Sequence, residues 1–136
     1  MRAELTKSAS FRLDGRRALV TGAGRGIGLT AAAALADAGA HVTLAARTTE
    51  EIEDAAGAIR ARGQKAEALT LDVTDVEVVR RAIAAAEPFQ ILVNNAGMNR
   101  PKMLPEVTVE DFDTIMGLNV RAAFFMAQAV ALRLIE

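Results

Sequence analysis

The chain carries the sequence ALVTGAGRGIG at residues 18–28. The apolar run from Ala18 to Val20 indicates a strand buried on both faces, and a segment of strong helix formers starts at Gly26. A strand, a glycine-rich turn and a helix N-terminus form a pyrophosphate site, because glycines admit phosphates to the backbone and the helix dipole favours negative charge. The turn therefore predicts a dinucleotide site, with Gly28 packed too closely on the sheet for any side chain.

The same alternation of strand and helix continues beyond the turn. The strands expected are 18–20, 41–46, 66–71 and 90–93. The helices expected are 26–38, 48 or 49 to about 62, 74 or 75 to about 86, and one or two from 108 to the last residue. Threonine and aspartate at 48, 49, 74, 75 and 108 are the expected N-caps. Such βαβ units predict a single α/β domain with a doubly wound parallel sheet.

The composition excludes several classes of function. With 51% hydrophobic and 24% charged residues, the 136-residue chain is globular and long enough for one domain. Zero cysteine and one histidine, His41, predict no metal site, and a net charge of −1 argues against a nucleic-acid partner. The N-terminus has no apolar signal segment, and the apolar stretch 122–132 is too short to span a bilayer. We therefore expect a cytoplasmic protein without a membrane partner.

Further motifs accompany the turn, which reads T-G-x-x-x-G-x-G rather than G-x-G-x-x-G. Together with Leu71-Asp72-Val73, Asn94-Asn95-Ala96-Gly97 and FDTIMGLNV at 112–120, the pattern resembles the short-chain dehydrogenase/reductase family. The resemblance implies a Rossmann-like sheet of strand order 3-2-1-4. It covers about the first half of a typical family domain, so we expect a truncated dinucleotide-binding domain at 14–136 after a solvated arm at 1–13.

The resemblance also implies roles for individual residues. Asp72 would accept the adenine amino group, the backbone N–H of Val73 would bind the ring, and Asn119 would be the catalytic residue supplied by this chain. The expected cofactor-binding residues are Gly22, Gly24, Arg25, Gly26, Ile27, Arg47, Asp72, Val73, Asn95, Ala96 and Gly97.

The end of the second strand favours NADP, while NAD remains open. A site that prefers NAD usually has a carboxylate there for the ribose 2′-hydroxyl, and no carboxylate lies between Asp37 and Glu50. Arg47 follows that strand and Arg25 lies in the glycine turn, and a guanidinium pairs bidentately with a phosphate. The acidic run at 50, 51, 53 and 54 is interpreted as a solvated helix face.

The residues that the family uses for proton transfer are not all present. The resemblance implies a Tyr as general acid/base, a Lys that lowers its pKa, a Ser for the substrate carbonyl, and Asn119 to anchor a water. The chain has no Tyr, and its only serines are Ser8 and Ser10. We therefore expect an NADP(H)-dependent oxidoreductase for a small carbonyl or alcohol substrate, whose Ser and Tyr-x-x-x-Lys lie elsewhere, with these 136 residues inactive alone.

Two expectations concern partners. The missing Tyr keeps open an alternative, namely a non-catalytic nucleotide-binding or interaction module. The last helix carries overlapping apolar faces, and we expect a homo-oligomer through them. These faces comprise Ala123, Phe124, Ala127, Val130 and Leu134.

Overall fold

A four-stranded parallel sheet forms the centre of the molecule. The computed structural model describes residues 9–135. Its strands are β1 (Arg17–Thr21), β2 (His41–Ala46), β3 (Ala66–Thr70) and β4 (Ile91–Val93). Their order is β3-β2-β1-β4 and every pair is parallel, which confirms the predicted sheet.

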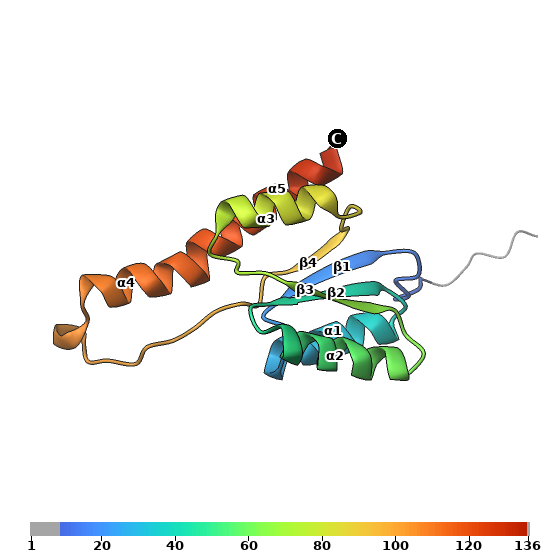
Figure 1. Cartoon of the computed structure of the whole chain (residues 1–136), viewed down its shortest axis with the longest axis horizontal. Helices are drawn as coiled ribbons and strands as arrows, with labels where there is room; N and C mark the ends of the chain where they lie inside the picture. The colour runs from blue at the N-terminus through green and yellow to red at the C-terminus, as the bar shows by residue number, and fades with distance from the viewer. Residues whose placement is uncertain (1–8, 136) are drawn as a thin grey trace, which may run out of the picture.

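Helices cover both faces of this sheet. They are α1 (Gly26–Asp37), α2 (Thr49–Ala61), α3 (Val76–Ala85), α4 (Val109–Met116) and α5 (Ala123–Ile135). A short 3₁₀ turn occupies Leu104–Glu106, and a π-helical turn, Gly117–Ala122, joins α4 to α5. Helices α1 and α2 lie on one face, and α3 and α5 lie on the other (Figure 1). The doubly wound α/β class is therefore confirmed.

Local side-chain chemistry explains where two of the helices, α3 and α4, begin. The Asp75 carboxylate accepts the N–H of Val78 and caps α3. Thr108 and Asp111 form a reciprocal capping box at the start of α4. At α2 the sequence prediction is only half right, because Thr48 is the N-cap by position but its hydroxyl makes no capping hydrogen bond.

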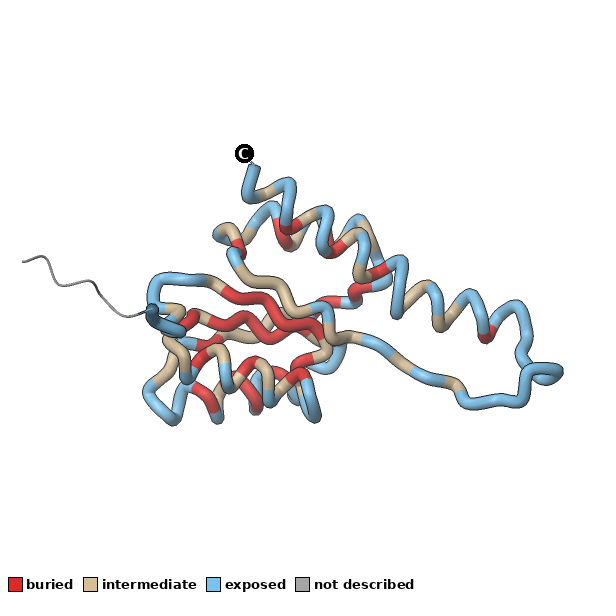
Figure 2. Tube along the Cα trace, turned by 180° about the vertical axis from the view of Figure 1, so that it is seen from behind, coloured by how far each residue is buried: buried red, intermediate tan, exposed pale blue. Residues whose placement is uncertain are grey.

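Alternation along the strands divides the core into two layers. Val20, Val42 and Leu44 are fully buried in the layer under α1 and α2. Leu19 belongs to the other layer, where it is buried with Met126 of α5. Figure 2 shows this burial concentrated in the strands and in the inward stripes of the helices. The second layer fixes where α5 lies on the sheet.

A polar cluster crosses the amino ends of three strands. The sheet register pairs Arg17 with His41 and Thr43 with Glu67. Glu67 Oε1 accepts hydrogen bonds of 2.7 Å from Arg17 Nη2 and from Thr43 Oγ1, and Arg17 Nη1 lies 3.0 Å from His41 Nδ1. The Arg17 guanidinium also lies 5.4 Å from the centre of the Phe89 ring. His41 thus has a structural setting, with an acidic neighbour that only the register supplies.

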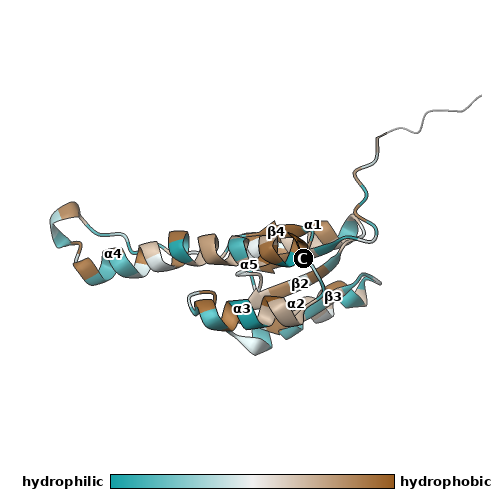
Figure 3. Cartoon of the chain, turned by 90° about the horizontal axis from the view of Figure 1, so that it is seen from above, coloured by the Kyte–Doolittle hydropathy of each residue, from teal (hydrophilic) through white to brown (hydrophobic). Residues whose placement is uncertain are grey.

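The chain from Val109 to Ile135 is one continuous helical rod of 27 residues. It is long and apolar enough to cross a membrane by length and composition alone, so the expectation that the late apolar stretch is too short is wrong on length. Its residues Ala122, Met126 and Val130 are buried in the core beside α3. Toward α4 the rod stands clear of the sheet (Figure 3) and exposes Phe112.

The end of the predicted arm is attached to the domain. Residues 1–8 of the arm lie outside the described part of the chain. Arg12 donates to the backbone oxygen of Asp37 at 3.0 Å and to Asp14 at 2.7 Å. The N–H of Leu13 donates to the Ala38 oxygen at 2.8 Å. These contacts hold residues 12 and 13 against the carboxyl end of α1, while residues 9–12 remain exposed to solvent.

Glu67 is expected to make the stability of the sheet depend on pH. Burial raises the pKa of Glu67, but the hydrogen bonds from Thr43 and Arg17 lower this pKa by more than burial raises it. The net pKa of Glu67 therefore lies below the usual range. A carboxyl with a depressed folded pKa stabilises the fold above the unfolded pKa, and this contribution is lost as pH falls through the folded pKa. With the Glu67 side chain 45% exposed, we expect Glu67→Gln to lower the free energy of unfolding by about 0.5–1 kcal/mol at pH 7.

Urea unfolding of wild type and variant measures this difference. The difference in free energy of unfolding between wild type and Glu67→Gln should shrink as the pH falls below the ordinary pKa of glutamate, about 4.3. Glu87→Gln is the matched control, because Glu87 is exposed. Equal losses in the two variants, or a loss independent of pH, would contradict the role given to Glu67.

Candidate functional site

A pocket of about 300 Å³ lies where the carboxyl ends of the four strands meet. Ligands of open α/β sheets bind at this edge, beside the strand from which the chain winds both ways. Here that strand is β1, which pairs with β2 on one side and β4 on the other. Predicted cofactor residues that line the pocket are Gly22, Gly24, Arg25, Arg47, Asp72, Val73, Asn95, Ala96 and Gly97.

Three predicted residues do not line the pocket. Gly26 and Ile27 are the first two residues of α1, and the Ile27 side chain is 81% exposed. Asn119 lies in the π turn behind Gly97. The lining residues that sequence reasoning missed are Ala46, Thr48, Glu51, Leu71, Thr74 and Leu118.

The glycine turn is shaped by close backbone approach. Gly22 has φ +63° and Gly26 has φ +58°, a left-handed conformation that favours glycine. A Cβ at position 28 would collide with the carbonyl oxygen of Gly22 and with the Asn95 amide. The start of α1 therefore lies directly on the end of β1, as the turn predicts.

Thr21 and Asn95 fasten the glycine turn to the segment after β4. The Asn95 amide donates to the carbonyl oxygens of Thr21 and Gly22, each at 3.1 Å. The Thr21 hydroxyl, in a residue 1% exposed, accepts the N–H groups of Asn95 at 3.1 Å and Ala96 at 3.0 Å. The Asn95 side chain thus holds the turn in place, and the backbone of 95–97 forms the adjoining wall of the pocket.

Asp72 presents an ionised carboxylate after β3. Its Oδ1 accepts the Thr74 hydroxyl at 2.7 Å and the Thr74 N–H at 2.9 Å. These hydrogen bonds lower the pKa of Asp72, and the positive charge of Arg47 adds to the effect. One carboxylate oxygen is thus used by the turn, and the carboxylate remains a hydrogen-bond acceptor in the pocket wall.

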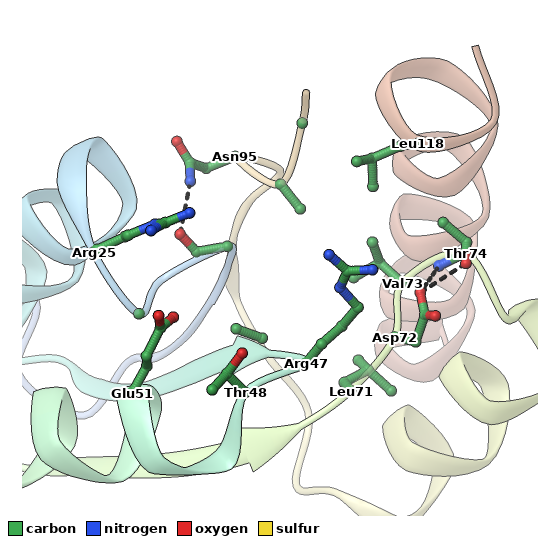
Figure 4. Close-up of a pocket in the computed structure, with 15 residues that line it drawn as sticks. Arg25, Arg47, Thr48, Glu51, Leu71, Asp72, Val73, Thr74, Asn95 and Leu118 are labelled. Atoms are coloured by element: carbon green, nitrogen blue, oxygen red, sulfur yellow. Dashed lines mark hydrogen bonds between the residues drawn. The ribbon is translucent and has the colours of Figure 1, made fainter. Parts of the chain in front are cut away.

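Two cations and an unexpected carboxylate share the pocket. The side chains of Arg25 and Arg47 extend into it from opposite sides, and Glu51 reaches up from α2 on the Arg25 side (Figure 4). Two sequence interpretations are therefore wrong: Glu51 does not belong to a merely solvated face, and the end of β2 does have a carboxylate nearby. Helix α2 begins at Thr49, which places Glu51 in its first turn beside the end of β2.

Asn119 joins the rod to the loop that follows β4. Its Oδ1 accepts the Met98 N–H and its Nδ2 donates to the Met98 oxygen, both at 2.9 Å. Both ends of the side-chain amide are therefore paired with backbone. The role of Asn119 in a proton relay stays a prediction, since its side chain here positions residues 97 and 98.

A pair of salt bridges to Asp111 holds the same loop farther along the chain. The Asp111 carboxylate pairs with Lys102 at 2.5 Å and with Arg100 at 3.4 Å. The hydrogen bond from Lys102, together with those from Thr108, holds the pKa of Asp111 well below its usual range. Asp111 thus ties the loop to α4. Within residues 9–135, no group of three or more His, Cys, Asp or Glu side chains is placed to hold a metal ion.

Comparison with known proteins places this pocket in context. The family described as short chain dehydrogenase matches residues 16–136. The chain is 47% identical over 129 residues to gluconate 5-dehydrogenase of Gluconobacter oxydans (strain 621H), covering 92% of this chain and 50% of that protein. It is 41% identical over 126 residues to D-erythrulose reductase of Gallus gallus, covering 93% and 49%. The chain thus spans about half the length of these curated relatives.

Solved structures give the same result. The chain superposes with a TM-score of 0.86 and 43% identity on gluconate 5-dehydrogenase from Burkholderia cenocepacia J2315 in complex with NADP and tartrate. That match covers 92% of this chain and 51% of the other. A short-chain type dehydrogenase/reductase from Mycobacterium marinum gives a TM-score of 0.87 at 36% identity, covering 92% and 52%.

The tight packing at Gly28 leads to a stability prediction. Gly28→Ala is expected to lower the free energy of unfolding by about 1–3 kcal/mol, because the added Cβ meets backbone that cannot move without disturbing β1. Gly57→Ala in α2 is the matched control, since the nearest atom to its Cβ would be Arg60 Nη2 at 3.9 Å. That control should gain about 0.5–1 kcal/mol from helix propensity. Urea unfolding measures both, and a neutral Gly28→Ala would refute the packing argument.

Proposed function

This chain belongs to the short-chain dehydrogenase family, and on that premise we propose that it is the cofactor-binding part of an NADP(H)-dependent oxidoreductase. The enzyme transfers a hydride between the nicotinamide and the carbonyl or alcohol carbon of a small substrate. The pocket in which Arg25 and Arg47 converge at the end of the sheet is the observation that carries this proposal. The similarity to a gluconate 5-dehydrogenase in complex with NADP supports it.

The residues of the pocket fit a phosphorylated dinucleotide. The backbone at Gly22 and Gly24 and the N-terminus of α1 bind the pyrophosphate, because free N–H groups and the helix dipole favour its charge. Arg25 and Arg47 bind the 2′-phosphate, since two guanidinium groups supply the donors and charge that a phosphate dianion needs. Asp72 accepts the adenine amino group. When bound, the nicotinamide supplies or accepts the hydride.

The proton chemistry needs residues that these 136 do not contain. A phenol with a pKa of about 10 works as a general acid/base near neutral pH only beside a cation. No Tyr occurs here, so the Ser and Tyr-x-x-x-Lys of the reaction lie outside the chain, and these residues alone are inactive. Asn119 contributes the part of the proton relay that this chain supplies.

The names of the relatives support a substrate class, and the exposed apolar side chains of the rod support an assembly. The relatives named gluconate 5-dehydrogenase and D-erythrulose reductase favour a small polyhydroxylated carbonyl compound or alcohol as substrate. We propose a homo-oligomer through the rod, whose Phe124 is 62% exposed and whose Val120 is 53% exposed. We place the protein in the cytoplasm.

A non-catalytic nucleotide-binding or interaction module is the second candidate. The lack of Tyr among the 136 residues favours it, as does the apolar surface that α4 exposes at Phe112 and Val109. Oxidation of polyols with NADP⁺ separates the two candidates when it is measured on a protein that joins these 136 residues to the part expected to carry the Ser and Tyr-x-x-x-Lys, because the 136 residues alone are inactive under either candidate. Turnover supports the oxidoreductase, and NADPH binding without turnover on any polyol supports the module.

Arg47 tests the proposed cofactor preference. We expect Arg47→Ala to weaken binding of NADPH about tenfold more than binding of NADH, a difference of about 1.4 kcal/mol, because only NADPH carries the 2′-phosphate. Titration of each cofactor by nucleotide fluorescence measures the two dissociation constants. Arg81→Ala is the matched control, since Arg81 is exposed on α3 and does not line the pocket. Equal losses for the two cofactors would remove the phosphate role from Arg47.

Asp72 tests adenine binding separately. Asp72→Ala is expected to weaken 5′-AMP and 2′,5′-ADP equally, by about tenfold, because both share the adenine amino group. Thr74→Val is the control, since it removes the 2.7 Å hydrogen bond within the turn but keeps the carboxylate. Isothermal titration gives the affinities. If Thr74→Val reproduces the whole loss, the turn and not the carboxylate is responsible.

A further inference from the structure

We propose that Glu51 is a specificity-determining residue of the nucleotide pocket, which makes the site accept an unphosphorylated ribose as well as a 2′-phosphorylated one. Its carboxylate accepts hydrogen bonds from ribose hydroxyls and opposes the charge of a 2′-phosphate. The inference rests on the proposed function, because it assumes an adenosine ribose near the ends of β1 and β2.

The position of Glu51 is built into the fold. Helix α2 begins directly after the segment that carries Arg47 and Thr48, so its first turn lies beside the end of β2. Thr48, Arg47 and Glu51 all line the pocket, whereas Glu50, the preceding residue of the same turn, does not. Helical geometry thus selects one of two adjacent glutamates for the site.

Gly24 shows how closely Glu51 approaches the glycine turn. A Cβ at position 24 would lie 2.9 Å from Glu51 Oε2 and 3.2 Å from Glu51 Cβ. The backbone of Gly24 is not left-handed, in contrast to Gly22 and Gly26. Conformation therefore does not require glycine at position 24, and the space that a side chain would fill there is occupied by Glu51.

The Glu51 carboxylate is available to a ligand. Among the described residues it makes no ion pair within 4 Å, while Glu53 of the same helix pairs with Arg60 at 3.7 Å. It faces the same cavity as Arg25 and Arg47 (Figure 4). The Thr48 hydroxyl is also unused as a helix cap. The Glu51 carboxylate, the Thr48 hydroxyl and the guanidinium groups of Arg25 and Arg47 are therefore all available to the group at the ribose 2′-position.

The negative charge of Glu51 favours the ligand without a 2′-phosphate in two ways. A carboxylate that accepts a ribose hydroxyl stabilises the unphosphorylated ligand. The same charge near a phosphate dianion destabilises the phosphorylated ligand, although solvent screening keeps the effect small at an exposed site. Removing the charge of Glu51 therefore shifts preference toward the 2′-phosphate from both directions.

The test uses two nucleotide fragments, 2′,5′-ADP and 5′-AMP, which need no catalytic residues. Isothermal titration of the full chain gives both dissociation constants and their ratio. We expect Glu51→Gln to shift this ratio toward 2′,5′-ADP by about threefold to fivefold at low salt, and less at high salt. Glu50→Gln removes the same charge from the same turn without touching the pocket, and it should leave the ratio unchanged.

The outcomes separate this inference from the proposed function. An unchanged ratio in Glu51→Gln, or an equal shift in Glu50→Gln, overturns the role of Glu51 while the Arg47 test of the cofactor site still stands. A shift toward 5′-AMP overturns it as well, since the carboxylate would then act with the wrong sign. If the wild-type chain binds neither fragment, the proposed cofactor site fails, and the inference fails with it.

Discussion

The contact between the glycine turn and the segment after β4 is the constraint on which the pocket depends. Because position 28 has no side chain, the N-terminus of α1 rests on the backbone of Gly22. Thr21 and Asn95 then close the same junction with hydrogen bonds from both sides. A buried hydroxyl that accepts two N–H groups leaves little freedom to either segment. The pocket wall is rigid here because three stretches of chain are locked to one another.

The parts of the structure that follow from local rules were predictable from the sequence. Buried strands, alternating helices and the caps at Asp75 and Thr108 follow from neighbouring residues, and the strand order follows from a family pattern spread over the chain. The place of Glu51 could not be predicted in this way, because it depends on the exact residue at which α2 begins. The acidic neighbour of His41 and the attachment of Arg12 arise from segments distant in sequence, which only the register and the packing bring together.

The site combines rigid and adjustable groups. The contacts at the junction fix the backbone at Gly22 and Ala96, so a bound group must fit this backbone in one definite geometry. The side chains of Arg25, Arg47 and Glu51 are exposed, and they can rearrange around different ligands. Such a division lets one fold keep a common binding frame while its charge pattern selects among related nucleotides.

The continuous helix from Val109 to Ile135 also limits how the length of this chain can vary. Each residue added to or removed from a helix rotates everything beyond it by about 100°. In the rod, such a change would turn Met126 and Val130 away from α3 and carry Asn119 off Met98. The loop between β4 and α4 has no helical rotation that an added residue would change. Its anchors are the contacts of Met98 with Asn119 and of Arg100 and Lys102 with Asp111. Insertions and deletions in related sequences should therefore collect in that loop and avoid the rod.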